Sequence, residues 1–124
     1  MLALRRSKRV LLLDDDAAIQ RLVSSILRTA GFRIDIVDMG SLAIEKLESD
    51  PYDAILLDLM MPTEGGLTVV KYLRGHKPEL LKRALLLTAS PDSVVRNVER
   101  EVAGVIHKPF TREQLIDAVK RVAK

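Results

Sequence analysis

Residues 53–62 read Asp-Ala-Ile-Leu-Leu-Asp-Leu-Met-Met-Pro, and the fold class of the chain can be inferred from this stretch. The apolar run before Asp58 is too short for a helix, and Pro62 stops the pattern four residues after the carboxylate. Such a run is typical of a strand that is buried on both faces and ends in a loop. Asp58 is therefore the candidate centre of chemistry.

The same kind of pattern recurs on both sides of this stretch. Residues 10–13 and 84–87 are continuous apolar runs, residues 33–37 alternate as an edge strand does, and residues 105–106 form a brief strand. Helical spacing of apolar residues follows each strand, in segments that begin near Ala17, Ser41, Gly66, Pro91 and Thr111. Five strands that alternate with five helices predict an α/β fold with one doubly wound parallel sheet.

The helical patterns also predict caps and buried faces. In the first helix, Leu22 is one of the residues expected to face the core, and in the second Leu42 is expected to do so. Ser41 is expected to cap the second helix, and Thr111 with Gln114 forms a capping-box pattern at the start of the last.

The length of 124 residues and a composition of 48% hydrophobic and 30% charged side chains favour one soluble domain. The chain has no cysteine, so disulfides and thiolate metal sites are excluded. It has no apolar run of about 20 residues and no secretory signal pattern. We therefore expect a cytoplasmic protein that does not enter a membrane.

The formal net charge of +3 comes from the start of the chain. Residues 1–9 hold Arg5, Arg6, Lys8 and Arg9 and no acid, while the rest carries 16 of the 20 basic and all 17 acidic side chains. The body is not basic, and two Tyr and two Phe are too few for a base-stacking surface. We expect a basic tail over residues 1–8, a domain over residues 9–124, and no direct contact with nucleic acid.

Polar side chains gather where the predicted strands end. Asp14 and Asp15 follow the first strand, Asp58 the third, Thr88 the fourth and Lys108 the fifth. Taken singly they could be a helix cap, a loop hydroxyl and a solvated amine. Together at one edge of a parallel sheet, three carboxylates would repel one another, so a divalent cation is the expected occupant. Oxygen ligands favour Mg²⁺, or alternatively Mn²⁺.

At this point the chain resembles the receiver domain of two-component response regulators, the CheY-like family. The likeness covers residues 9–122 and is carried by Val-Leu-Leu-Leu-Asp-Asp-Asp, Leu-Leu-Asp-Leu-Met-Met-Pro with Gly66 four residues later, Leu-Leu-Thr-Ala, and Lys-Pro-Phe. This resemblance implies a flavodoxin-like sheet of strand order 2-1-3-4-5 and identifies residues 9–124 as a receiver domain. It also implies phosphoryl transfer from histidine to aspartate.

The resemblance assigns roles to the matching positions. Asp58 would be the phosphoacceptor, Asp15 a direct Mg²⁺ ligand, Asp14 a ligand acting mainly through water, and the main-chain carbonyl of Met60 a third protein ligand. Lys108 would pair with the phosphoryl group. Physical chemistry agrees, because a carboxylate that attacks phosphorus needs the phosphoryl oxygens neutralised and held in line.

A switch is implied as well. The hydroxyl of Thr88 would donate to the new phosphoryl group and draw the following loop inward. The peptide bond between Lys108 and Pro109 is expected to be cis, which would direct the amine inward. One departure stands out: many receivers have an aromatic switch residue three positions before the lysine, and here that residue is Val105. Val105 is either an altered switch position or plain core.

The resemblance implies partners too. A sensor histidine kinase or a histidine phosphotransfer protein would donate the phosphoryl group, since neither His76 nor His107 lies at a matching position. Phosphorylation would alter the face built by residues 91–106 and the last helix, and so control a downstream partner or an attached output domain. That face carries Arg96, Arg100, Lys120 and Arg121, which suit an acidic partner or a homodimer.

Two other functions stay open. The chain could be a degenerate receiver that serves only as a protein-interaction scaffold. It could also be a Mg²⁺-dependent phosphohydrolase with Asp58 as nucleophile, although Met60 stands where haloacid-dehalogenase-type enzymes place a second carboxylate. Under the leading interpretation the chain is not an enzyme beyond its own phosphorylation and dephosphorylation.

Overall fold

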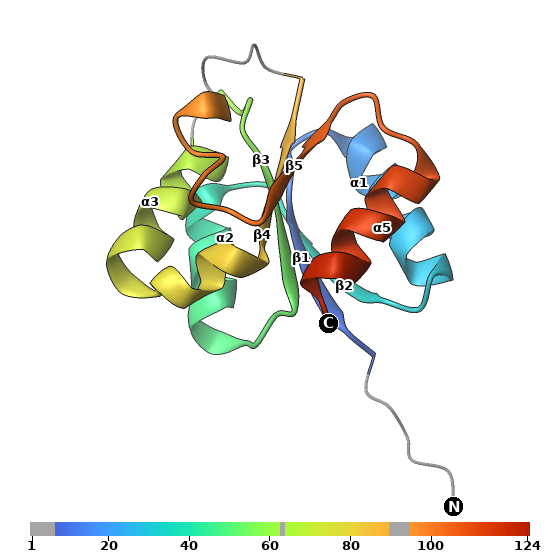
Figure 1. Ribbon diagram of the computed structural model, residues 1–124, viewed down its shortest axis with the longest axis horizontal. Coiled ribbons are helices and arrows are strands. Elements are labelled where there is room, and N and C mark those ends of the chain that lie inside the picture. Colours follow the sequence, from blue (N-terminus) through green and yellow to red (C-terminus); the bar gives the residue numbers. More distant parts are fainter. Residues whose placement is uncertain (1–6, 63, 90–94) are drawn as a thin grey trace, which may run out of the picture.

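The computed structural model describes residues 7–62, 64–89 and 95–124, and one five-stranded parallel sheet lies at its centre (Figure 1). The strands are β1 (Arg9–Leu13), β2 (Arg33–Val37), β3 (Ala54–Asp58), β4 (Ala84–Thr88) and β5 (Gly104–His107). Their order is β2-β1-β3-β4-β5, and each neighbouring pair is parallel. The predicted doubly wound, flavodoxin-like fold is confirmed.

Helices cover both faces of this sheet. They are α1 (Ala17–Thr29), α2 (Gly40–Ser49), α3 (Gly66–His76), the 3₁₀ helix η1 (Pro78–Arg83) and α5 (Arg112–Val122). In Figure 1, α2 and α3 lie on one side of the sheet, and α1 and α5 lie on the other. A helical segment therefore follows every strand, because Val95 and Arg96 are helical between β4 and β5. None of the described helices is long and apolar enough to cross a membrane.

The sheet separates two apolar cores. Alternate residues of one strand point to opposite faces, so Leu11 and Leu13 of β1 join the core beneath α2 and α3, while Val10 and Leu12 join the core beneath α1 and α5. All five residues of β3 and of β4 are buried. Burial on both faces explains why the central strands read as unbroken apolar runs.

Two predicted core residues were wrong. Leu22 is 46% exposed and Leu42 is 40% exposed. In α2 the buried stripe is Gly40, Ala43 and Leu47, and Leu42 lies about 100° around the helix from Ala43. In α1 the buried residues include Ser24, whose hydroxyl donates to the Arg21 carbonyl at 3.4 Å. A serine satisfied in this way can be buried without an apolar partner.

The predicted cap of α2 was also wrong. The helix begins at Gly40, so Ser41 lies inside it, and the flanking residue Met39 makes no side-chain capping bond. The capping box of α5 is confirmed: Thr111 and Gln114 each accept a backbone N–H from the other, at 3.0 and 2.8 Å. The start of the fourth predicted helix, at Pro91, lies outside the described residues. Within residues 95–101, Val98 and Glu99 both donate to the Val95 carbonyl, at 3.0 and 2.8 Å.

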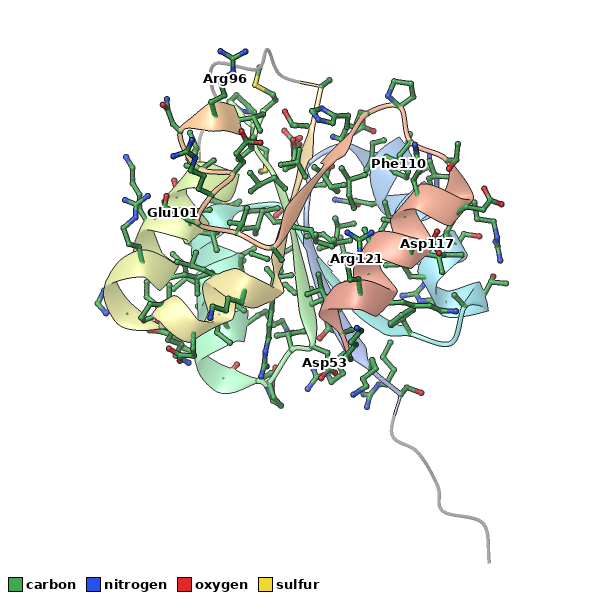
Figure 2. All side chains as sticks on the ribbon, viewed as in Figure 1. Asp53, Arg96, Glu101, Phe110, Asp117 and Arg121 are labelled. Atoms are coloured by element: carbon green, nitrogen blue, oxygen red, sulfur yellow. The ribbon has the colours of Figure 1, made fainter. Side chains whose placement is uncertain are left out.

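Arg9 is not part of a solvated tail. Its guanidinium lies 3.0 Å from the carboxylate of Asp35 and 4.9 Å above the ring of Tyr52, whose hydroxyl donates to the same carboxylate at 2.6 Å. Its backbone N–H and C=O both bond to Asp53, each at 2.8 Å. Figure 2 shows Asp53 at the end of the sheet where the strands begin. These contacts join the start of β1 to the middle of β2 and to the residues just before β3.

Candidate functional site

The polar residues predicted from the strand ends meet at the carboxyl edge of the sheet. β1 and β3 are hydrogen-bonded neighbours with Leu13 opposite Leu57, so the residues that follow them lie side by side. Oxygen atoms of Asp14, Asp15 and Asp58 lie within 4.8 Å of one another. The structure thus brings together all three carboxylates that the sequence singled out.

Burial makes this acidic cluster unusual. Asp14 is 0% exposed and Asp58 is 3% exposed, while Asp15 is open to solvent. Burial is the largest cause that raises the pKa of Asp58, and the charges of Asp14 and Asp15 raise it further. The Met60 N–H, which donates to the Asp58 carboxylate at 3.0 Å, and the charge of Lys108 act in the opposite direction. Asp58 is therefore a carboxylate that gains from a nearby cation.

Lys108 supplies one such cation. Its ammonium donates to the Asp14 carboxylate at 3.1 Å and lies 3.6 Å from the Asp58 carboxylate. The peptide bond to Pro109 is cis. The Lys108 N–H donates to the Thr88 carbonyl at 2.8 Å, which ties the loop after β5 to the end of β4. Lys108, which follows the edge strand β5, thus bridges two of the three carboxylates.

Asp14 is held by groups that sequence reasoning missed. Its carboxylate accepts the backbone N–H of Asp16 at 2.9 Å, and its main-chain carbonyl accepts the side-chain amide of Gln20 at 2.7 Å. Asp16 caps α1 by accepting the N–H groups of Ala18 and Ile19. The only signal in the sequence was the position of Gln20 in the first turns of α1, where a long polar side chain can reach back to the preceding loop.

The loop after Asp58 depends on glycine. A Cβ built on Gly66 would lie 2.7 Å from the Asp58 carbonyl oxygen and 3.1 Å from the Leu57 Cβ. No side chain fits in that space, so the start of α3 can approach β3 this closely only with glycine there. Met60 itself is 58% exposed at the mouth of the site.

The two predicted switch residues lie on neighbouring strands. Thr88 ends β4 and is fully buried, and it lies opposite His107 of β5. Val105 is half-buried and packs against the core beneath α2 and α3, together with the buried Val95 and Val98. The aromatic side chain of many receivers is thus replaced by a small apolar contact.

The donors of this cluster fit a hard divalent cation. Three carboxylates supply oxygen ligands within one small volume, and the exposure of Asp15 leaves room for water to complete a coordination shell. No sulfur or imidazole ligand is present in the cluster as described, which favours Mg²⁺ over softer metals.

The comparisons with known proteins agree with this site. The family model of the response regulator receiver domain matches residues 10–120. Response regulator MprA of Mycobacterium tuberculosis is 32% identical over 121 residues, which cover 95% of this chain and 51% of MprA. The chain thus spans about half the length of this curated relative.

Solved structures agree as well. The receiver domain of a sensor histidine kinase from Pseudomonas aeruginosa, which has a magnesium ion coordinated in its active site cleft, is 26% identical with a TM-score of 0.85. The match covers 95% of this chain and 98% of that one. TrrA of Thermotoga maritima, in complex with Mg²⁺-BeF, is 31% identical with a TM-score of 0.82, covering 93% and 98%. With its fold, its acidic cluster and the match over residues 10–120, the chain belongs to the response regulator receiver domains, the signalling domains of two-component systems.

Proposed function

We propose that Asp58 accepts a phosphoryl group from the phosphohistidine of a sensor histidine kinase or a histidine phosphotransfer protein. A bond forms between a carboxylate oxygen of Asp58 and phosphorus, and the bond from phosphorus to the donor imidazole nitrogen breaks, so that this nitrogen keeps the electron pair. The observation that carries the proposal is the bridging of Asp14 and Asp58 by Lys108 beside the exposed Asp15.

Each residue of the cluster has a task in this reaction. Asp14, Asp15, Asp58 and the Met60 carbonyl would hold Mg²⁺, which, when bound, neutralises the charge of the transferring group. The ammonium of Lys108 pairs with an oxygen of the incoming phosphoryl group. In doing so it leaves the carboxylates of Asp14 and Asp58, which it contacts in this structure. The N–H of Met60 keeps the attacking carboxylate oriented by its hydrogen bond at 3.0 Å.

The phosphorylated state is read out through β4 and the segment that follows it. Thr88 donates its hydroxyl to the phosphoryl group, and the segment after β4 moves with it. Because Val105 has no ring to reorient, the change is transmitted by the packing of Val95 and Val98 on the core. Residues 95–101 are joined to α3 by a bidentate ion pair between Arg74 and Glu101, at 2.6 and 2.7 Å.

The expected output face carries four exposed basic side chains. Figure 2 shows Arg96 on the short helical turn before β5 and Arg121 on α5. Arg100 and Lys120 are exposed as well. We expect charge reversal at Arg100 and Lys120 to weaken binding to an acidic partner, or self-association, by about tenfold or more, since like charges would then face each other. Analytical ultracentrifugation and binding assays of the phosphorylated protein would measure this, and unchanged association would contradict it.

Phosphorylation at Asp58 can be tested directly. Acetyl phosphate with Mg²⁺ is expected to add one phosphoryl group by intact mass, and beryllofluoride with Mg²⁺ to shift NMR signals around Asp58 and Thr88. Asp58→Asn, or chelation of Mg²⁺, is expected to abolish both effects. Asp117→Asn on the exposed surface of α5 is the matched control and should behave as the parent protein does.

Two outcomes would overturn the proposal. An unchanged mass and spectrum in the parent protein would indicate a scaffold that is not switched. Hydrolysis of a phosphate ester over many turnovers per molecule, abolished by Asp58→Asn, would indicate a phosphohydrolase with Asp58 as nucleophile.

A further inference from the structure

The N terminus of α2 is capped from a distant part of the chain. The first N–H groups of a helix have no acceptor within the helix. The residue before α2, Met39, makes no side-chain capping bond, and the first turn carries no acidic residue. Instead, the N–H of Gly40 donates to the main-chain carbonyl of Glu64 at 2.8 Å, and the N–H of Ser41 donates to the Glu64 carboxylate at 3.2 Å.

This contact is closely packed. A Cβ built on Gly40 would lie 3.1 Å from the Glu64 carbonyl oxygen and 3.2 Å from the Glu64 Cβ. The backbones can therefore approach this closely because residue 40 is glycine. The carboxylate of Glu64 also lies at the positive end of the helix dipole of α2, which adds an electrostatic attraction.

Glu64 belongs to the loop that leads from Asp58 to α3. One end of this loop is fixed by β3, where the Leu59 N–H donates to the Leu87 carbonyl at 3.1 Å. The other end is fixed where Gly66 packs under the Asp58 carbonyl. Met60 lies between these points and is 58% exposed. Its N–H is held by the Asp58 carboxylate at 3.0 Å, and the contact of Glu64 with α2 restrains the other end of the loop, next to α3.

We propose that Glu64 is a positioning residue of the metal site: by capping α2, it holds the loop so that the main-chain carbonyl of Met60 stands where it can bind Mg²⁺. The inference rests on the proposed function of the Asp58 site. Coupling of this kind is reciprocal, so Mg²⁺ binding strengthens the cap of α2 to the same extent that the cap strengthens Mg²⁺ binding.

The test compares Mg²⁺ affinity, amide exchange and phosphorylation in four variants. Glu64→Ala removes the carboxylate, Glu64→Gln keeps an acceptor oxygen without the charge, and Gly40→Ala displaces the Glu64 backbone without altering its side chain. Glu45→Ala, an exposed glutamate of the same helix, is the matched control. Mg²⁺ affinity is measured by calorimetry and NMR titration, and hydrogen exchange at the amides of Gly40 and Ser41 is measured with and without Mg²⁺.

In Glu64→Ala we expect Mg²⁺ to bind about tenfold more weakly, the lower end of the loss seen when groups that orient metal ligands are removed. Glu64→Gln should lie between Glu64→Ala and the parent, and Glu45→Ala should match the parent. Phosphorylation by acetyl phosphate should slow at limiting Mg²⁺ and return to the parent rate at saturating Mg²⁺. In the parent, Mg²⁺ should slow exchange at the amides of Gly40 and Ser41.

Parent-like Mg²⁺ affinity in Glu64→Ala, with only a lower melting temperature, would show a purely structural cap and overturn the inference. If Glu64→Ala does not fold, Gly40→Ala decides the matter, because it should lose Mg²⁺ affinity with the Glu64 carboxylate intact. If the parent protein binds Mg²⁺ and is phosphorylated, and the Glu64 and Gly40 variants match it, only the role of Glu64 is refuted. A parent that does neither refutes the proposed function, and the role of Glu64 falls with it.

Discussion

The main-chain carbonyl of Asp58 lies close to Gly66, so a substitution at Gly66 tests whether this close approach is needed. In Gly66→Ala the new methyl group would meet the Asp58 carbonyl at 2.7 Å, so β3 or α3 must shift. We expect a loss of about 1–3 kcal/mol in the free energy of unfolding, the usual range for overpacking. Urea unfolding would measure it.

Gly75 provides the matched control, because a Cβ there meets nothing within 4 Å. It lies in α3, as Gly66 does, and Gly75→Ala should increase stability by about 0.5–1 kcal/mol. Equal effects of the two substitutions would show that the close approach at Asp58 is not the reason for glycine at residue 66.

The positions of individual residues could be predicted where they lie at strand ends. They could not be predicted where they depend on contacts with distant main-chain groups. Asp14, Asp15 and Lys108 follow strands, Asp58 and Thr88 end them, and the carboxyl ends of parallel strands lie at one edge of the sheet. Gln20 and Glu64 were missed, because their partners are main-chain groups, which carry no mark in the sequence. Val105 was identified as unusual only through the resemblance to receivers, and its packing had to come from the structure.

Among the helices whose starts the structure describes, α5 has the most complete local start signal. The side chain of Thr111 accepts the Gln114 N–H at 3.0 Å. Thr111→Ala should lower the free energy of unfolding by about 1 kcal/mol, the typical cost of losing such a cap. Thr111→Ser keeps the acceptor oxygen and should cost much less. Thermal or urea unfolding would distinguish them, and an equal loss in both variants would assign the effect to the methyl group of threonine.

The contrast between α5 and α2 explains which element boundaries could be predicted. The cap of α5 lies three residues away in the sequence, so the capping box was visible in advance. The cap of α2 lies 23 residues away, at Glu64, and the nearby Ser41 was chosen wrongly. The 3₁₀ helix η1 was not predicted either, because its six residues make no period long enough to recognise.

Across the molecule, the ends of the strands that face away from the phosphoryl site carry a pH-sensitive cluster. The Tyr52 hydroxyl and the Arg9 guanidinium both donate to Asp35. Both bonds lower the pKa of Asp35, and the bond from Tyr52 has the larger effect. Burial raises the pKa of Tyr52, so its hydroxyl stays protonated as a donor. Because the folded pKa of Asp35 is depressed, the stabilisation is complete above the unfolded value of about 3.9 and is lost as pH falls through the folded value.

Tyr52→Phe should therefore lower the free energy of unfolding most at neutral pH, by about 1.5 kcal/mol, the usual net value of a hydrogen bond to a charged group. The difference from the parent should shrink in urea unfolding at about pH 3. Tyr72→Phe is the control, since its hydroxyl bonds to Glu48 at the exposed surface and should contribute far less. A pH-independent difference for Tyr52→Phe would mean that the ionisation of Asp35 does not matter.

The overall architecture was the most predictable property of the chain. Alternating strands and helices imply a parallel sheet, and unbroken apolar runs in β1, β3 and β4 place those strands in its interior. The neighbouring positions of β1 and β3 do not follow from the alternation, since several strand orders satisfy it. That order came from the resemblance to receivers, and the structure confirms it.

The fastening of β1 at both ends has a practical consequence for observing activation. Its start is joined to Asp35 and Asp53, and the N–H of Asp14, the residue after its end, donates to the Val37 carbonyl. β1 can therefore serve as the reference point for measuring displacements of other segments. Since the chain contains no cysteine, one label can be attached at a cysteine introduced at Ser7 and another at a cysteine introduced at Arg96. The distance between the two labels, compared before and after phosphorylation, would then report how far the segment around Arg96 moves relative to the start of β1.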